Sequence, residues 1–320
     1  MDKLTQGARK LVQHNGRVKP DEKVLIITDP SLQPIAELVT AEAKSVGAET
    51  VLVVMPERSS DGQEPPEMIS ATMTKADVVF TPVKKSITHT GAFKDALANG
   101  ARGILMTAYT EHVLSCPALL ETDFVSQEEI CYKLGDAFNQ GNSVHLTSEK
   151  GTDLTFSIQG RQANVLTGMP SPGQLAPVPT IEVNVVPVHG SAQGVLVADA
   201  SIPYLGIGVL KEPVTCIIEN GYVVCIRGGR QAQVLEEQLV SMNDRNCFNI
   251  AELGVGLNPN ANLTGFMLED EGVLGTIHIG IGTSITLGGE ISAPSHYDLL
   301  MWAPTLKIDG HIIQNDKQLI

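Results

Sequence analysis

The chain has 320 residues, of which 42% are hydrophobic and 18% are charged, as in ordinary globular proteins. This length corresponds to about two domains of ordinary size. With 36 acidic residues against 22 lysines and arginines, the formal net charge is −14, which argues against nucleic acid or an anionic membrane surface as a partner.

The N-terminal segment mixes charged and polar residues and contains no apolar run of the signal-peptide type, so we expect a cytoplasmic protein. No later segment resembles a membrane-spanning helix, which needs roughly 18 or more apolar residues. The five cysteines show no CxxC spacing. We therefore expect them to be buried small apolar side chains rather than disulfides, redox groups or zinc ligands.

The N-terminal part of the sequence alternates strands with helices. Apolar runs predict strands at residues 24–28 and 50–54, and an apolar stripe at helical spacing predicts a helix over residues 33–46 between them. Two further strands, at residues 76–80 and 102–106, and a helix at residues 91–99 repeat the pattern. This pattern predicts a Rossmann-like parallel sheet covered by helices. Asp29-Pro30-Ser31 follows the first strand where a nucleotide-binding protein has a glycine-rich fingerprint, so we expect no nucleotide cofactor.

The later part of the sequence is dominated by short β-type runs separated by Gly, Pro and Asn. The predicted strands lie at residues 154–158, 181–186, 194–199, 214–219 and 222–226. Asn220-Gly221, between the last two, is a strong hairpin signal, and a helix is predicted at residues 231–242. The expected fold class is therefore α/β plus α+β, with a Rossmann-like domain at residues 1–142 and a β-rich metal-binding domain at residues 143–320.

Candidate metal ligands occur in the last third of the chain. His278 alternates with isoleucines, so a strand would direct it to the face opposite them. His296 and Asp298 are two residues apart, which places both on one side of an extended segment. Together these three residues would form the two-histidine, one-carboxylate set that suits Fe(II) with open coordination positions.

These residues stand in an ordered set of segments at residues 248–259, 268–282 and 295–298. The set resembles the metal-binding half of the aminopeptidase T-like metallopeptidases and of their relatives, the 2,5-dihydroxypyridine 5,6-dioxygenases. The segments at residues 86–90 and 100–102 also resemble the N-terminal domain of that group. The resemblance thus extends over most of the chain.

The two branches of the group imply different sites. The peptidases hold two metals, and the positions that match their ligands are Glu252, one of Glu269 or Glu271, His278, His296 and Asp298. Their tyrosine ligand has no match at residues 279–290, unless Tyr297 replaces it. The dioxygenases use one iron held by two histidines and one aspartate, and His278, His296 and Asp298 match these. The resemblance therefore favours the dioxygenase branch.

Other polar residues have alternative interpretations. Glu252 is expected either to orient a ligand histidine and handle protons, or to belong to a structural acidic cluster. The same structural alternative applies to the run Glu269-Asp270-Glu271. His89, between two threonines, either contacts substrate as a catalytic residue or caps the start of a helix, and we favour the cap.

The function expected from the sequence is that of a mononuclear non-haem Fe(II) dioxygenase of the extradiol type, which opens a small hydroxylated N-heteroaromatic ring with O2. The alternative is a leucyl-type or aminopeptidase T-like aminopeptidase with one or two Zn, Co or Mn ions. A third interpretation is a non-enzymatic solute-binding or scaffold protein. The expected partners are a small-molecule substrate and O2, and the resemblance implies a homo-oligomer.

Overall fold

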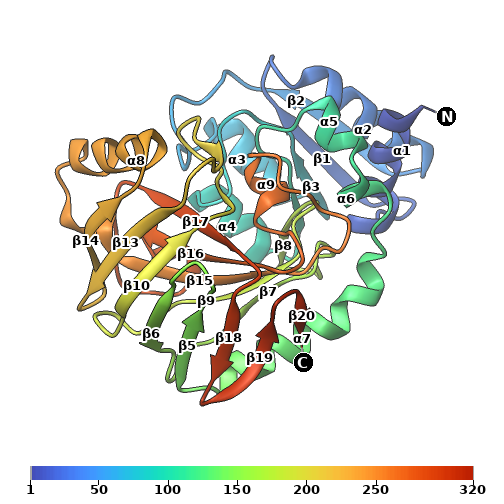
Figure 1. Ribbon diagram of the computed structural model, residues 1–320. Coiled ribbons are helices and arrows are strands. Elements are labelled where there is room, and N and C mark those ends of the chain that lie inside the picture. Colours follow the sequence, from blue (N-terminus) through green and yellow to red (C-terminus); the bar gives the residue numbers. More distant parts are fainter. Residues whose placement is uncertain (1, 320) are drawn as a thin grey trace. The chain divides into compact units, whose positions relative to one another are not determined.

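The computed structural model describes residues 2–319, which form two compact units (Figure 1). The first unit contains the residues up to Val125 and the segment Leu166–Thr180, and the second contains Ser126–Val165 and the residues from Ile181 onwards. The sequence placed one boundary between residues 142 and 143. The structure differs because the chain returns to the first unit to add a strand to its sheet.

The first unit is built on a five-stranded parallel sheet with the order β2-β1-β3-β4-β8. Its strands are β1 (Lys23–Thr28), β2 (Glu49–Val54), β3 (Val78–Thr81), β4 (Arg102–Leu105) and β8 (Leu175–Pro177). Its helices are α1 (Lys3–Arg9), η1 (Lys10–Asn15), α2 (Gln33–Ser45), α3 (Glu67–Met73), α4 (Gly91–Ala98), α5 (Glu111–Ser115) and α6 (Pro117–Leu120). The predicted parallel sheet is confirmed.

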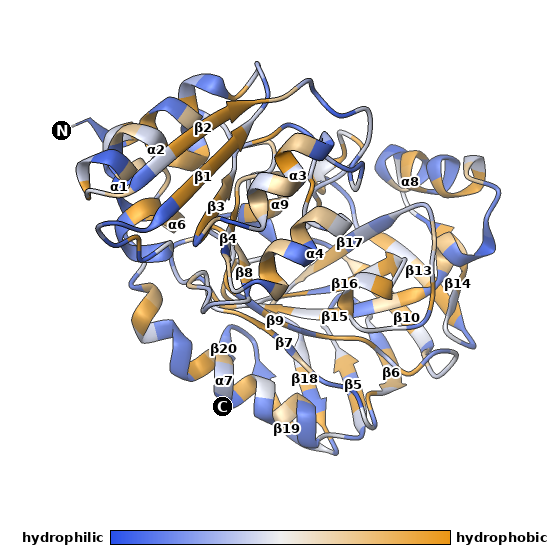
Figure 2. Cartoon of the chain, turned by 180° about the vertical axis from the view of Figure 1, so that it is seen from behind, coloured by the Kyte–Doolittle hydropathy of each residue, from blue (hydrophilic) through white to orange (hydrophobic). Residues whose placement is uncertain are grey.

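The core of this unit follows from the alternation of side chains along its strands. Leu25, Ile27 and Val79 on one face of the sheet pack with Met73 of α3 and Phe93 of α4. Figure 2 shows the apolar character of β1, β2 and β3. Strand β2 is nevertheless an edge strand, and its side chains are exposed or half-buried, unlike those of a central strand of a parallel sheet.

The second unit contains two antiparallel sheets of different size. The eight-stranded sheet has the order β14-β13-β10-β6-β5-β18-β19-β20, and the five-stranded sheet has the order β17-β16-β15-β9-β7. The strands of the larger sheet are β5 (Ser143–Thr147), β6 (Asp153–Ser157), β10 (Gln193–Ala198), β13 (Val214–Glu219), β14 (Tyr222–Arg227), β18 (Thr305–Ile308), β19 (His311–Asn315) and β20 (Gln318–Leu319). The smaller sheet contains β7 (Asn164–Leu166), β9 (Glu182–Val185), β15 (Ile250–Gly256), β16 (Thr276–Gly282) and β17 (His296–Trp302).

The remaining elements connect these strands. They are the hairpin of β11 (Ser201–Ile202) and β12 (Gly208–Val209), the helices α7 (Phe124–Gln140), α8 (Arg230–Ser241) and α9 (Met267–Asp270), and the 3-10 turns η2 (Arg245–Phe248) and η3 (Ile285–Leu287). The predicted hairpin turn is confirmed, since Asn220 and Gly221 both have positive φ between β13 and β14. Within residues 2–319, no helix combines the length and apolar character that crossing a membrane requires.

The mixed α/β fold class, with a parallel sheet in one unit and antiparallel sheets in the other, is therefore confirmed. All five cysteines are free, and four of them are buried. Burial raises the pKa of the thiols of Cys131 and Cys216 to about 12, so both are neutral and unreactive near neutral pH.

Candidate metal centre

Four adjacent strands of the smaller sheet carry the candidate ligands (Figure 1). In the register of the sheet, Gly280 of β16 lies between Glu252 of β15 and Asp298 of β17. Because residues two apart on a strand share a face, His278 and His296 project on the same side as these two carboxylates. The strands therefore direct the two histidines and Asp298 to the same face of the sheet, as the sequence predicted.

Two glycines leave room for the imidazole rings on this face. A Cβ atom on Gly254 would lie 2.0 Å from Nε2 of His278, and a Cβ atom on Gly280 would lie 2.6 Å from Nε2 of His296. Any larger side chain would therefore displace a ring. The glycines create a space into which both imidazoles point.

His296 is held in a defined orientation. Its Nδ1–H donates to the carbonyl of Thr283 at 2.7 Å, so Nε2 is the nitrogen that faces the carboxylates. Nε2 lies 2.8 Å from Oε2 of Glu252 and 3.2 Å from Oδ1 of Asp298. Burial by itself lowers the pKa of His296, but the charge and hydrogen bond of Asp298, with Glu252, raise it well above its usual value.

His278 is buried and lies farther from its neighbours. Its Nε2 is 3.7 Å from Oε2 of Glu182 and 3.8 Å from Oε1 of Glu252. Burial opposes the charged form, but Glu252, Asp298 and Glu182 together raise the pKa of His278 to about 9. Within residues 2–319, Nδ1 of His278 and Oε2 of Glu182 are buried side-chain atoms that have no hydrogen-bond partner. Unpaired buried polar atoms are costly, so this arrangement is incomplete by itself.

A chain of amides supports Glu182. Asn184, two residues along β9, donates from Nδ2 to Oε1 of Glu182 at 2.8 Å. Asn164 of β7 donates from its own Nδ2 to Oδ1 of Asn184, also at 2.8 Å, and to the carbonyl of Leu287 at 3.0 Å. Burial raises the pKa of Glu182 to about 7. One oxygen of this carboxyl group is thus fixed, and the other points toward His278.

A tyrosine hydroxyl reaches the site from the β11–β12 hairpin. Tyr204 lies 2.7 Å from Oδ2 of Asp298 and 2.8 Å from Oε1 of Glu271. One hydroxyl proton cannot be donated to two ionised carboxylates, so both contacts are hydrogen bonds only if one carboxyl group is protonated. Burial and the charge of Asp298 raise the pKa of Glu271 well above its usual value, whereas His296 and His278 overcome burial and lower that of Asp298. Of the two carboxyl groups, that of Glu271 therefore takes up a proton more readily.

The other two residues of the acidic run are structural. Asp270 accepts hydrogen bonds from the hydroxyl of Ser201 and from the backbone N–H groups of Thr264 and Gly265. Glu269 accepts from the N–H of Asn262 and the hydroxyl of Thr264. These bonds fix the loop before α9. Of the three acidic residues, Glu271 makes the contact with Asp298.

Two groups of side chains in the described structure are close enough to share a cation. One consists of Glu252, His296 and Asp298, and the other of Glu182, Glu252 and His278; in each group the donor atoms lie within 4.8 Å of one another. Glu252 belongs to both groups and therefore connects His278 with the His296–Asp298 pair. The residues fit a divalent transition metal, because imidazole and carboxylate donors lie on one face, Oε2 of Glu182 faces His278 without a hydrogen-bond partner, and glycines leave space around the rings.

Two sequence-based interpretations are corrected. His89 is exposed in the loop between β3 and α4, and the side chain that caps α4 is that of Thr90, which accepts from the N–H of Phe93. Tyr297 does not replace the absent tyrosine ligand, because it alternates with His296 and Asp298 on β17 and hydrogen-bonds with the side chain of Gln238.

Glu182 and Tyr204 were not predicted. The sequence contains a signal for Glu182, since Glu182 and Asn184 alternate with Ile and Val in a predicted strand, and buried polar residues need partners. Tyr204 has no comparable signal, because it lies in a short turn. Only the three-dimensional structure brings it to Asp298.

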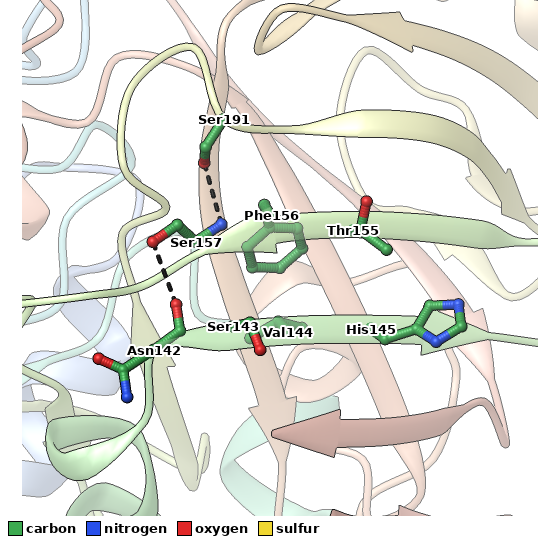
Figure 3. A pocket seen from close by; sticks show the side chains of 8 residues that line it. All are labelled: Asn142, Ser143, Val144, His145, Thr155, Phe156, Ser157 and Ser191. Atoms are coloured by element: carbon green, nitrogen blue, oxygen red, sulfur yellow. Dashed lines mark hydrogen bonds between the residues drawn. The ribbon is translucent and has the colours of Figure 1, made fainter. Parts of the chain in front are cut away.

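A depression of about 410 Å³ lies elsewhere in the second unit, on the larger sheet (Figure 3). It is lined by side chains of β5 and β6 and by Ser191, whose hydroxyl accepts from the N–H of Ser157. Its imidazole, His145, is half-buried and pairs with Asp153 at 2.8 Å. This depression has no convergent buried donors, so the centre on the smaller sheet remains the candidate site.

The structure is thus that of a mixed α/β protein with a buried histidine–carboxylate centre, and solved structures share its fold. The structure resembles that of 2,5-dihydroxypyridine dioxygenase from Pseudomonas putida with a TM-score of 0.87 at 21% identity, covering 100% of this chain and 98% of the other. It also resembles AmpT from Thermus thermophilus with a TM-score of 0.69 at 16% identity, covering 99% of each chain.

The sequence comparison then specifies the family. The model of the NicX family, 2,5-dihydroxypyridine 5,6-dioxygenase, matches residues 4–320. The chain belongs to this family. The 2,5-dihydroxypyridine 5,6-dioxygenase of Pseudomonas putida is 27% identical over 173 residues, an alignment that covers 50% of this chain and 49% of that protein. The matched segment thus spans about half the length of this curated relative.

Proposed function

We propose that the protein is an Fe(II)-dependent dioxygenase that opens the ring of a small hydroxylated N-heteroaromatic compound such as 2,5-dihydroxypyridine. The observation that supports the proposal is that His278, His296 and Asp298 project from one face of the smaller sheet, where Glu252 lies close both to His278 and to the His296–Asp298 pair. The family match over residues 4–320 supports the reaction class.

The proposed iron ligands are His278, His296 and Asp298. Bound Fe(II) would supply open coordination positions and the electron exchange that O2 chemistry requires. His296 presents Nε2 because its Nδ1–H is engaged by the carbonyl of Thr283. The orienting bond keeps the ring in one tautomer, as partners of metal-binding histidines commonly do.

Glu252 is the proposed proton acceptor. It is buried and burial opposes its ionisation, but His278 and His296 lower its pKa, so it is ionised near neutral pH. Its Oε2 can accept a proton from a substrate hydroxyl group that enters the site, and burial keeps bulk water from competing. We also propose that His89 contacts the substrate. The alternative role predicted for it, capping α4, belongs to Thr90.

The test is anaerobic loading with Fe(II) followed by O2 uptake with 2,5-dihydroxypyridine. We expect consumption of O2 and of the substrate at equal rates, with about one iron per chain. Zn(II) should occupy the same ligands and support no turnover, because it cannot exchange electrons. Iron-loaded protein that consumes no O2 with any hydroxylated pyridine would refute the proposal.

The second candidate function is that of a metal-dependent aminopeptidase. The observation that favours it is the second donor group, Glu182, Glu252 and His278, which shares Glu252 with the first and so resembles a site for two ions. Cleavage of leucyl substrates by the Zn(II) or Co(II) form, with two metals per chain, would establish this function instead.

A further inference from the structure

The two carboxylate oxygens of Asp298 have different partners. Oδ1 lies 3.2 Å from Nε2 of His296, on the side of the proposed metal. Oδ2 lies 2.7 Å from the hydroxyl oxygen of Tyr204, which also lies 2.8 Å from Oε1 of Glu271. A carboxylate can bind a metal through one oxygen or through both, and the choice decides how many coordination positions stay open. The hydroxyl of Tyr204 therefore engages the oxygen that a bidentate aspartate would use.

The backbone fixes Tyr204 relative to Asp298. The hairpin that carries Tyr204 joins β17 directly, because the N–H of Ala200 donates to the carbonyl of Leu300, two residues after Asp298. Within the turn, the N–H of Tyr204 donates to the carbonyl of Ile202. Ser201, at the start of the hairpin, is bonded to buried Asp270. These hydrogen bonds fix the backbone that leads to Tyr204, whose hydroxyl lies against Oδ2.

A second aromatic ring packs against Tyr204. The rings of Tyr204 and Tyr297 have centroids 5.4 Å apart and planes tilted by 55°. The hydroxyl of Tyr297 is hydrogen-bonded to Gln238, because Tyr297 projects from the face of β17 opposite to that of Asp298. The two tyrosines therefore differ in function although they are neighbours, and Tyr297 provides a matched control.

We propose that Tyr204 is a positioning residue that restricts Asp298 to binding the metal through one oxygen, which keeps a coordination position available for substrate. This inference rests on the proposed metal site. It assigns Tyr204 a role in shaping the site, and it predicts that removal of one hydroxyl changes the coordination number without removing the metal.

The test uses Co(II) as a spectroscopic probe in the intact chain. The visible absorption of Co(II) weakens as its coordination number rises, because a more centrosymmetric environment makes the transitions less allowed. Tyr204→Phe should bind Co(II) at the wild-type stoichiometry but lose absorption intensity per bound ion, since Oδ2 is free to coordinate. Tyr297→Phe should retain the wild-type spectrum.

Each outcome bears on the inference. An unchanged spectrum in Tyr204→Phe, or an equal change in Tyr297→Phe, overturns it while leaving the metal site intact. A wild-type protein without a Co(II) spectrum, or one whose spectrum survives in His296→Ala, overturns the proposed site and the inference with it. If Tyr204→Phe does not fold, a crystal structure of the Co(II)-loaded wild type decides: one Asp298 oxygen on the metal supports the inference, and two overturn it.

Discussion

Carboxyl groups away from solvent have different surroundings in the two units. In the first unit, buried Asp29 accepts from the N–H of Ser31 through Oδ1 and from the N–H of Lys84 through Oδ2. Glu22 pairs with the guanidinium of Arg102 at 2.6 Å. In the second unit, three buried carboxyl groups and that of Glu271 surround two imidazoles. Within this cluster of the described structure, Oε2 of Glu182 and Nδ1 of His278 have no hydrogen-bond partner. The carboxylates of Asp29 and Glu22 in the first unit thus have partners, whereas Oε2 of Glu182 in the cluster of the second unit has none.

This difference separates a structural role from a functional one. A buried charge with all its partners stabilises the fold, whereas a cluster with excess negative charge and unpaired atoms needs a further cation. In the metal-free protein, the neighbouring carboxylates raise the pKa of His278 and His296, so protons on these rings offset part of the negative charge. The following predictions test whether the contrast between the units is real.

The largest effect is expected for His296→Ala. This substitution removes the imidazole that lies 2.8 Å from Glu252 and 3.2 Å from Asp298. We expect loss of nearly all bound Fe(II) or Co(II), measured by metal analysis after gel filtration. His145→Ala is the matched control, because His145 also lies 2.8 Å from a carboxylate, but its side chain is 42% exposed, compared with 22% for His296. Stoichiometric metal in His296→Ala would exclude this residue as a ligand.

The next prediction concerns the pH dependence of stability in the metal-free protein. The folded state raises the pKa of His278 from 6.5 to about 9, so its contribution is complete below pH 6.5 and is lost as the pH rises toward 9. The loss is on the order of 3 kcal/mol. Glu182 also makes the folded state less stable as the pH rises, but between about pH 4.5 and 7, because burial raises its folded pKa from 4.5 to about 7.

Urea unfolding at a series of pH values measures this effect. His278→Gln should show a flatter dependence between pH 6.5 and 9, while His145→Gln should keep the wild-type slope. Bound Co(II) replaces the protons, so metal affinity should rise over the same range. A metal-free wild type that is equally stable at pH 6.5 and pH 9 would show that the histidines are not protonated in the folded state.

The sequence was most informative where hydrophobic periodicity was strong. The strand predicted at residues 214–219 coincides with β13, and the helix predicted at residues 231–242 differs from α8 by one residue at each end. Strand β8 was missed, because three residues between Gly- and Pro-rich turns carry no periodic signal. It forms because it pairs in parallel with β4, which is a long-range contact.

The candidate site shows the same division: residues on strands with clear alternation were predictable from the sequence, and residues placed by long-range pairing were not. Alternation along β16 and β17 was enough to place His278, His296 and Asp298 on one face, since the strand period is strictly two. Glu182 reaches the cluster only through the pairing of β9 with β15, which the sequence does not specify. Tyr204 depends on the hydrogen bond that joins its hairpin to β17. Residues contributed by a neighbouring strand or turn require the topology.

A smaller effect is expected for Gly254→Ala. The added methyl group would lie 2.0 Å from Nε2 of His278, so the ring must move away from Glu182 and Glu252. We expect Co(II) affinity to fall about 10- to 100-fold, measured by competition with a chelator. Gly91→Ala is the control, because its Cβ meets only the flexible side chain of Glu64 at 3.2 Å. Wild-type affinity in Gly254→Ala would show that the ring position is not critical.

The smallest effect tests the first unit. Asp29→Asn replaces one carboxylate oxygen with an NH2 group. The remaining oxygen can accept from the N–H of Ser31 or from that of Lys84, and the other N–H then faces a group that cannot accept. A buried donor left without an acceptor costs about 1–3 kcal/mol, so the midpoint of urea unfolding should fall by a corresponding amount. Co(II) affinity of the folded variant should stay at the wild-type value, because Asp29 belongs to a fully paired network rather than to the metal centre. Unfolding curves and chelator competition on the same sample separate the two effects. A fall in metal affinity as large as that of Gly254→Ala, without a fall in stability, would mean that the buried charges of the first unit serve the site and that the contrast between the units does not hold.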